Sequence, residues 1–379
     1  MEVEKLLGEL VHIKSSFPEE AEICNYLEGY LKERGFMVER LLVEDNRYDL
    51  LAERGSGGDA LLFYGHMDTV PLYGTWESDP FTLTERGGKL YGLGARDMKG
   101  GLAAILTALD SAGDQHIKVL ICVDEENISK GAWKAVVDRR DWFKDVKLVV
   151  SGDGATSQTS NGGVTTVTLG RRGRCVVTID VRGLSSHGAD PGKGVNAINE
   201  AARIADNAHR IPLNTHQKLG SDGIFVRMIE GRATSLSLPE NASLELDCHF
   251  VPPGSAEEMR QRVEKFIGTL RQEGKLDDRT VVTVALRKRE TPYLEPYVTS
   301  EDDERVGNVI QIVRENFGEI VRNYGSSVAD DNALARVLNV PVVTLWPEGR
   351  NAHAQNEYSV KKSLQDVTAL FTMIISNWK

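Results

Sequence analysis

The apolar residues of this chain follow one rhythm in its two outer parts and another in its middle, and this change limits the possible folds most. In the outer parts, short apolar runs at residues 60–64, 117–123 and 147–150 alternate with helical segments near 99–112 and 130–140. Such alternation is typical of buried strands in an α/β sheet that carries helices on both faces. We therefore predict an α/β sheet for the outer parts.

The middle of the chain, from about Arg174 to about Thr291, predicts a different arrangement. Its pattern is strand, helix, strand, strand, helix, strand, which is the split βαβ unit of ferredoxin-like folds. We expect these elements at residues 175–181, 195–208, 224–229, 242–250, 256–272 and 281–286. A length of 379 residues also suggests two or three domains. We predict a small domain, residues 174–291, inserted into a larger one formed by residues 1–173 and 292–379.

The charge and composition of the chain exclude several classes of partner. A net charge of −11 and the lack of a long basic run argue against nucleic acid. The N-terminus lacks the basic start and apolar stretch of a secretory signal, and no apolar run approaches the roughly 18 residues that cross a bilayer. Four widely spaced cysteines form neither a zinc ribbon nor a disulfide framework. We expect a cytoplasmic protein without a membrane partner.

Residues that can bind metal ions occur at five places where a predicted strand ends or a loop begins. In open α/β sheets, ligands bind outside the carboxyl ends of the strands, so we expect these residues to converge on one crevice. His66 follows the run that ends at Tyr64, and Asp68 is placed to accept the second ring N–H of this histidine. Asp153 follows the run at 147–150, and His353 lies near the C-terminus.

Asp97 stands at a glycine-rich entrance to a predicted helix. A dinucleotide fingerprint would need glycine at this position, and a carboxylate would repel the pyrophosphate, so we reject a nucleotide site. The two oxygens of a carboxylate can each bind one ion. Asp97 is therefore suited to bridge two cations.

Three adjacent acids, Asp124, Glu125 and Glu126, follow the run at 117–123. Acids crowded in this way repel one another and have raised pKa values unless cations neutralise them. Adjacent strand residues face opposite ways, so one of Glu125 and Glu126 can bind an ion while the other addresses a bound water. This division suits a ligand and a general base.

Together these places supply two imidazoles and three carboxylates, enough for two ions that share one bridge. Nitrogen and oxygen ligands without thiolate suit Zn²⁺, with Co²⁺ or Mn²⁺ as substitutes. Each residue alone has a simpler interpretation, such as a hydrogen-bonded loop histidine or a helix N-cap. Their joint occurrence at successive strand ends favours a metal site.

Five motifs of the chain resemble a known family. They are His66-Met-Asp68, Gly92-Leu-Gly-Ala-Arg-Asp97-Met-Lys-Gly-Gly, Asp124-Glu-Glu126, Ser185-Ser-His187-Gly-Ala-Asp-Pro191 and Asn351-Ala-His353. In this order they resemble the co-catalytic zinc peptidases and deacylases that include acetylornithine deacetylase, succinyl-diaminopimelate desuccinylase, aminoacylase and glutamate carboxypeptidase. The likeness covers nearly the whole chain. It implies a zinc-peptidase-like mixed sheet flanked by helices, with an inserted ferredoxin-like (βαββαβ) lid and dimerisation domain.

The resemblance also implies a role for each ligand. His66 and Asp153 are expected to hold one metal ion, and Glu126 and His353 the other. Asp97 is expected to bridge the two ions.

The same resemblance implies how the reaction proceeds. Glu125 is similar to the general base, which takes a proton from a water shared by the two ions and returns it to the leaving nitrogen. His187 is similar to a histidine that reaches into the partner's site of a homodimer and supports the oxyanion.

Two departures from the family pattern concern the substrate. Many relatives carry an Asn three residues before a Pro of the inserted domain, and here Leu236 precedes Pro239. We expect Leu236 to be a packing residue of the inserted sheet. Many relatives also carry an Asp-x-Arg pattern, and here it reads Asp247-Cys-His249. The loss of this Arg removes a bidentate fork for a substrate carboxylate, and His249 is a partial replacement that we expect to contact substrate.

One ligand bears on the substrate class. Asp153 stands where deacylase and carboxypeptidase branches often carry Glu, and Asp is more similar to aminopeptidase and dipeptidase branches. We predict a metal-dependent amide hydrolase that cleaves short peptides, of dipeptidase, aminopeptidase or carboxypeptidase type, through a metal-bridging water. An N-acyl-amino-acid deacylase, of acetylornithine deacetylase or succinyl-diaminopimelate desuccinylase type, is the alternative. A non-catalytic relative that binds metal or peptide is an alternative of another class, and Glu125→Gln would leave its function unchanged.

Overall fold

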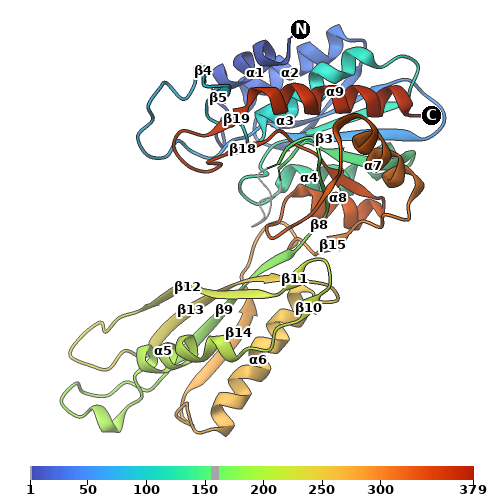
Figure 1. Cartoon of the computed structure of the whole chain (residues 1–379). Coiled ribbons are helices and arrows are strands. Elements are labelled where there is room, and N and C mark those ends of the chain that lie inside the picture. The colour runs from blue at the N-terminus through green and yellow to red at the C-terminus, as the bar shows by residue number, and fades with distance from the viewer. Residues whose placement is uncertain (1, 155–161) are drawn as a thin grey trace. The chain divides into compact units, whose positions relative to one another are not determined.

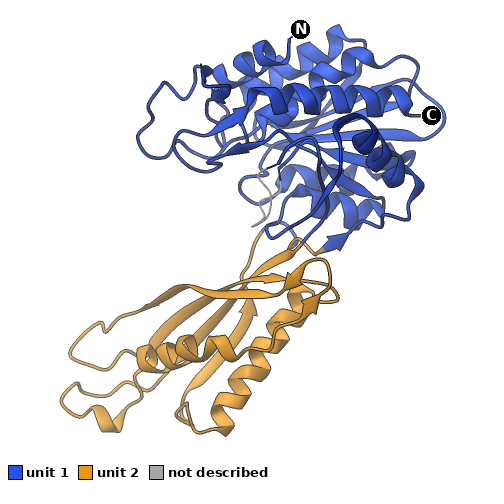
Figure 2. Cartoon of the chain, in the orientation of Figure 1, with its two compact units in different colours: residues 1–171, 290–292, 297–379 blue, residues 172–289, 293–296 orange. Residues whose placement is uncertain are grey.

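The computed structural model describes residues 2–154 and 162–379 and divides the chain into two compact units (Figures 1 and 2). Unit 1 consists of Met1–Arg171, Glu290–Pro292 and Tyr297–Lys379, and unit 2 consists of Arg172–Arg289 and Tyr293–Pro296.

The segment Tyr293–Pro296 belongs to unit 2, although the sequence placed it in the larger domain. The backbone N–H of Arg174 donates to the carbonyl oxygen of Leu294 at 3.0 Å, which attaches this segment to the first strand of unit 2.

The main sheet of unit 1 is mixed, with nine strands among the described residues in the order β1-β2-β6-β3-β7-β17-β8-β15, while β16 pairs with β8. The strands are β1 (Met37–Glu44), β2 (Arg47–Arg54), β3 (Ala60–His66), β6 (Ile117–Cys122), β7 (Val146–Ser151), β8 (Thr166–Arg171), β15 (Tyr297–Val298), β16 (Val321–Gly325) and β17 (Val342–Thr344). The central strand β3 is buried at every position and runs parallel to β6 and β7. Central parallel strands need cover on both faces.

Helices cover both faces of this sheet, as the sequence predicted. They are α1 (Val3–His12), α2 (Ala21–Glu33), α3 (Lys99–Ala108), α4 (Lys130–Asp138), α7 (Glu304–Phe317), α8 (Asp330–Leu338) and α9 (Lys361–Asn377), with short 3-10 turns η1 (Leu109–Ser111) and η2 (Arg140–Phe143). Side chains alternate along β3, so Leu61 and Phe63 pack under one group of helices while Leu62 and Tyr64 pack under the other.

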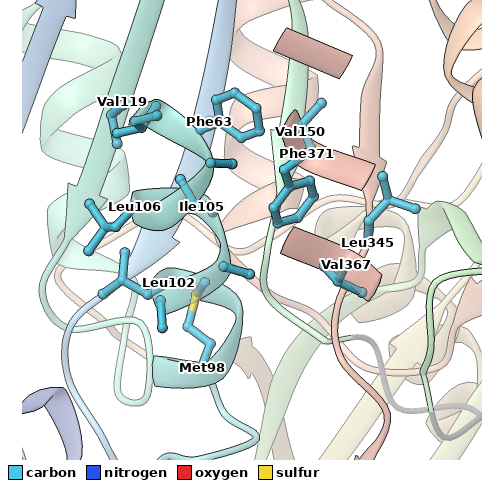
Figure 3. Close-up of a cluster of buried hydrophobic side chains, with 14 of the residues drawn as sticks. Phe63, Met98, Leu102, Ile105, Leu106, Val119, Val150, Leu345, Val367 and Phe371 are labelled. Carbon is cyan, nitrogen blue, oxygen red and sulfur yellow. The ribbon is translucent and has the colours of Figure 1, made fainter. Parts of the chain in front are cut away.

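The larger core lies between the sheet and the helices α1, α2, α3, α7 and α9. Figure 3 shows Phe63 of β3 and Phe371 of α9 beside Ile105 of α3, and the two phenylalanine rings meet edge to face with centroids 5.6 Å apart. Edge-to-face pairs add stability beyond the area they bury. The sheet that carries the site therefore rests on a closely packed base.

Unit 1 also contains a small sheet in the order β18-β19-β5-β4. Its strands are β4 (Thr84–Arg86), β5 (Lys89–Tyr91), β18 (Gly349–Arg350) and β19 (Tyr358–Val360). The pairing of β19 with β5 joins the C-terminal part of the chain to the segment before α3. The sequence did not predict this sheet, because strands of two or three residues are too short to show a period.

Unit 2 has the six elements in the predicted order. They are β9 (Gly173–Arg182), α5 (Ala197–Asn207), β12 (Gly223–Gly231), β13 (Asn241–Phe250), α6 (Ala256–Gln272) and β14 (Val281–Leu286), with the additional short elements η3 (Pro191–Lys193), η4 (Ala208–Arg210), β10 (Thr215–His216) and β11 (Gly220–Ser221). The strand order β12-β13-β9-β14 is that of a split βαβ unit, and α5 and α6 share one core with the sheet. Asn196 and Ser255 cap the two helices.

Among the residues that the structure describes, no helix combines the length and the apolar character needed to cross a bilayer.

Candidate active site

The predicted metal ligands lie at strand ends or in the loops beside the small sheet. His66 is the last residue of β3, Asp153 lies two residues after the end of β7, and Glu126 lies in the turn after β6. These three strands are parallel neighbours, so the segments that follow them meet at one edge of the sheet. Asp97 lies between β5 and α3, and His353 lies between β18 and β19.

The structure brings all five predicted ligands together with Glu125. Three groups of side chains each have one ligand atom per residue within 4.8 Å of the others: His66, Asp97 and Asp153; Asp97, Glu126 and His353; His66, Glu125 and Glu126. Asp97 belongs to two of these groups. The arrangement therefore provides two adjacent positions for a cation, with one carboxylate between them.

The distances around Asp97 suit ions rather than hydrogen bonds alone. His66 Nε2 lies 3.6 Å from Asp97 Oδ1, and His353 Nε2 lies 3.4 Å from Asp97 Oδ2, so each oxygen faces a different imidazole. Two ligand atoms on one tetrahedral zinc ion are separated by roughly 3.4 Å. His66 Nε2 is buried and has no hydrogen-bond partner among the described residues. A buried, unpaired nitrogen beside carboxylates fits a divalent cation.

The pKa values of the clustered side chains also favour a site for cations. Burial raises the pKa of Glu125 well above its usual range, and the negative charge of Asp153 raises it further. Burial also raises the pKa of Asp153 to about 7. The carboxylates of Asp97 and Glu126 raise the pKa of His353 to about 10. The cluster thus attracts positive charge, which protons or cations can supply.

Asp68 connects His66 to the turn that carries the two glutamates. His66 Nδ1 lies 3.1 Å from the backbone oxygen of Asp68 and 3.4 Å from its Oδ1. The Asp68 carboxylate also accepts hydrogen bonds from the backbone N–H groups of Glu125, at 3.3 Å, and Glu126, at 3.0 Å. The backbone oxygen and the carboxylate of Asp68 are therefore both placed to accept the N–H of His66 Nδ1, the backbone oxygen at the shorter distance.

Asp124 does not join the cluster, and the expectation that all three adjacent acids need metal cations is wrong for this residue. Its Oδ1 lies 3.0 Å from Nη2 of the buried Arg47, which also pairs with Glu20 at 2.6 Å. Its Oδ2 accepts hydrogen bonds from the backbone N–H groups of Ile128 and Lys130. Asp124 thus closes the turn that presents Glu125 and Glu126, and an arginine neutralises it.

Two buried charged residues next to the ligands were missed by sequence reasoning. Arg171 Nη2 donates to the backbone oxygen of Asp153 at 2.7 Å, and Arg171 Nε donates to Asp331 Oδ2 at 2.9 Å. Glu357 accepts hydrogen bonds from backbone N–H groups of the segment 94–97. The one signal for Glu357 in the sequence was its place four residues after His353.

Two further predicted residues belong to unit 2, whereas the cluster belongs to unit 1. His187 is exposed, and its Nδ1 accepts a hydrogen bond from the backbone N–H of Ala189 at 3.1 Å. His249 lies on β13 with Nδ1 3.7 Å from Asp247 Oδ1, and burial lowers the pKa of His249. The roles of both histidines stay predictions.

Leu236 is 84% exposed, so the expectation that it packs in the inserted sheet is wrong. The residue lies outside the strands of unit 2, between β12 and β13.

A mixed α/β sheet whose edge carries two imidazoles and several carboxylates, grouped around a shared aspartate, defines a metallohydrolase. Residues 62–377 match the family model described as peptidase family M20/M25/M40, and the chain belongs to this family. The resemblance seen in the sequence motifs is thereby confirmed. The protein is a metal-dependent hydrolase that acts on amide bonds.

Individual relatives include both deacylases and peptidases. The chain is 25% identical over 386 residues to succinyl-diaminopimelate desuccinylase of Sulfurimonas denitrificans, with all of both chains covered. It is 38% identical over 183 residues to acetylornithine deacetylase of Klebsiella pneumoniae, a match that covers 46% of this chain and 45% of the other. The crystal structure of aminopeptidase PepT from Bacillus cereus shares the fold, with a TM-score of 0.79, 21% identity and coverage of 98% and 97% of the two chains.

Proposed function

We propose that this protein is a two-metal amide hydrolase of short peptides. In this proposal His66 and Asp153 hold one divalent ion, Glu126 and His353 hold the other, and Asp97 bridges them. The observation that carries the proposal is the place of Asp97, whose two oxygens lie 3.6 Å from His66 Nε2 and 3.4 Å from His353 Nε2. A carboxylate that faces two imidazoles in this way suits a bridge between two ions.

We infer that the native ions are Zn²⁺, with Co²⁺ or Mn²⁺ as functional substitutes. The donor atoms of the cluster are imidazole nitrogens and carboxylate oxygens, which suit these metals. The four cysteines are free and buried and belong to none of the candidate groups in the described part of the chain. Free buried thiols also support a cytoplasmic location.

When bound, a pair of divalent ions lowers the pKa of a shared water toward about 7 and polarises the scissile carbonyl. Glu125 is the general base. Its Oε2 lies 4.0 Å from His66 Nε2 and so faces the cluster, where the carboxylate can take a proton from a water and pass it to the leaving nitrogen. Asp68 holds both His66 and the backbone of Glu125, and it therefore fixes the base relative to the ligand.

We propose a separate role, as a lid and dimerisation domain, for the inserted domain predicted at residues 174–291, most of which belongs to unit 2. His187 of one protomer would support the oxyanion in the site of a partner subunit, and its exposure on the loop between β9 and α5 is compatible with that role. His249 would contact the substrate carboxylate. Arg174 lies directly across from it in the β9–β13 pair, and the guanidinium of Arg174 pairs with Asp247 through Nε at 2.9 Å and Nη2 at 2.6 Å.

Two observations bear on whether the substrate is a short peptide or an acylated amino acid. The ligand after β7 is Asp153, which resembles the aminopeptidase and dipeptidase branches of the family. The full-length match to a desuccinylase favours the second candidate, a deacylase of N-acyl amino acids. In both reactions Glu125 performs the same proton transfer, so the two candidates differ only in what binds around the amide.

The test is a substrate panel with the cobalt-loaded full-length protein. Dipeptides, acetylornithine and succinyl-diaminopimelate are compared by kcat/KM, and we expect the dipeptides to give the highest values. A higher value for an acylated amino acid would transfer the assignment to the deacylase. Activity that survives exhaustive chelation would reject the two-metal mechanism, and unchanged function of Glu125→Gln would favour a non-catalytic binding protein.

A further inference from the structure

The segment 351–357, which carries His353, has an unusual backbone. Asn351, His353 and Asn356 have positive φ values of 63°, 60° and 56°, which lie in the left-handed region. Residues other than glycine adopt this region at a cost in free energy, and they stay there only when surrounding contacts enforce it. The position of the His353 imidazole therefore depends on what anchors this segment.

Two of the anchors are exposed hydrogen bonds. The backbone N–H of Thr75 donates to Gln355 Oε1 at 3.0 Å, and the backbone N–H of Glu77 donates to Asn356 Oδ1 at 2.9 Å. Exposed hydrogen bonds of this kind exchange readily with water and contribute little to rigidity.

The buried anchor is Glu357, whose exposed fraction is 1%. Glu357 Oε1 accepts hydrogen bonds from the backbone N–H groups of Arg96 and Asp97, both at 2.8 Å, and Oε2 accepts one from Gly94 at 2.9 Å. Glu357 directly precedes β19. The pairing of Tyr358 with Tyr91 brings Glu357 against the loop that follows β5 and contains Asp97. One carboxylate thus satisfies three backbone donors, two of them buried and one part-buried, and an apolar side chain would leave all three unpaired.

Glu357 therefore links two ligands of the cluster without belonging to any candidate metal group of the described residues. It lies four residues after His353 and binds the backbone of Asp97, and His353 Nε2 lies 3.4 Å from Asp97 Oδ2. We propose that Glu357 is a positioning residue that sets the separation of His353 from Asp97, and with it the second cation position, formed by Asp97, Glu126 and His353. This inference rests on the proposed two-metal function.

The two cation positions depend on Glu357 to different extents. In the first position, His66 and Asp153 are held by β3 and β7 of the main sheet, and only Asp97 belongs to the loop that Glu357 binds. In the second position, both His353 and Asp97 belong to segments that Glu357 connects. Loss of Glu357 should therefore weaken the second ion more than the first.

The experiment compares Glu357→Gln and Glu357→Ala with the control Gln355→Ala in the full-length protein. Metal-free samples are titrated with Co²⁺, and binding is followed by visible absorption, which reports the coordination of each ion. Glutamine keeps one carbonyl oxygen for Arg96 and Asp97 but turns an amide N–H toward the N–H of Gly94. We expect Glu357→Gln to bind the first equivalent of Co²⁺ as the wild type does. Its affinity for the second equivalent should fall on the order of 10- to 100-fold, and the affinity of Glu357→Ala should fall further.

The control separates positioning from general loosening of the segment, because Gln355→Ala removes only an exposed anchor. We expect this variant to bind both equivalents with affinities within about twofold of wild type. Equal losses in Gln355→Ala and Glu357→Gln would overturn the inference, and so would wild-type affinities and spectra in Glu357→Gln. If Glu357→Ala does not fold, Glu357→Gln carries the test. Fewer than two equivalents in the wild type would instead reject the two-metal function itself.

Discussion

Arg171 Nη2 lies 2.7 Å from the backbone oxygen of Asp153 and 3.4 Å from Asp153 Oδ2. The same guanidinium donates through Nε to Asp331 Oδ2 at 2.9 Å, and Arg171 and Asp331 are both fully buried. The guanidinium of Arg171 therefore neutralises the carboxylates of both Asp153 and Asp331, and Asp153 is a proposed metal ligand. This arrangement keeps Asp153 in place whether or not a metal ion is present.

We predict that Arg171→Met lowers the free energy of unfolding of the metal-free protein by about 3–5 kcal/mol, because it leaves two buried carboxylates without the positive charge that neutralises them. Denaturant unfolding measures this loss. Arg171→Lys keeps the charge but not the two-armed geometry, so its loss should be smaller. A loss below 1 kcal/mol in Arg171→Met would mean that Asp153 and Asp331 do not depend on this cation.

A second prediction separates the two adjacent glutamates. Glu125→Gln should lower kcat by about 10²- to 10⁴-fold, because it removes the general base, while the protein still binds two metal ions. Glu126→Gln should lower the metal content, because this residue is a proposed ligand beside His353. Metal analysis after dialysis, combined with initial rates, distinguishes the variants. Equal metal loss in both would assign Glu125 to the ligands instead.

A third prediction concerns the stabilisation of the folded protein by divalent ions. Because the cluster gathers buried carboxylates and imidazoles, the folded state should bind divalent ions far more tightly than the unfolded chain. At a free metal concentration 100 times Kd, each site adds about 2.7 kcal/mol to the free energy of unfolding. Thermal unfolding with and without Zn²⁺ measures the shift. The variant His353→Ala should show a smaller shift than wild type.

Much of the fold and of the cluster could be predicted from the sequence because the signals are local. The helix α6 and the strand β14 begin and end at the predicted residues, since each shows a clear apolar period. His66 ends β3, Asp153 lies two residues after β7, and Asp97 lies two residues before α3. Residues at the ends of parallel neighbouring strands must meet, so their convergence could be inferred without knowledge of any contact.

The contacts that could not be predicted from the sequence join residues that are distant in the chain. Arg47 neutralises Asp124 across 77 residues, Arg171 binds Asp331 across 160, and Glu357 binds Arg96 across 261. A single sequence gives each of these residues an ordinary charge and does not show which opposite group the fold brings to it. The small sheet that aligns Glu357 with Asp97 is invisible for a related reason, since its strands are too short to show a pattern.

A last prediction concerns alkaline pH and two residues of α2. Burial raises the pKa of Cys24 from 9.0 to about 11 and that of Tyr30 from 10.0 to about 12. The folded-state pKa of each group lies above its unfolded value, so the unfolded chain loses these protons first as pH rises. The stabilising contribution of the Cys24 thiol is complete below pH 9 and is lost as pH rises through about 11.

Guanidinium unfolding of the metal-free protein between pH 8 and 11 measures this dependence, and we expect the free energy of unfolding to fall across that range. The matched variant is Cys24→Ala, which removes one titrating group from the buried face of α2. Its free energy of unfolding is lower throughout, because the side chain no longer fills its place in the core, but it should fall less steeply between pH 9 and 11. Parallel curves for the two proteins would show that the thiol keeps the same pKa in the folded and unfolded chains, contrary to its complete burial.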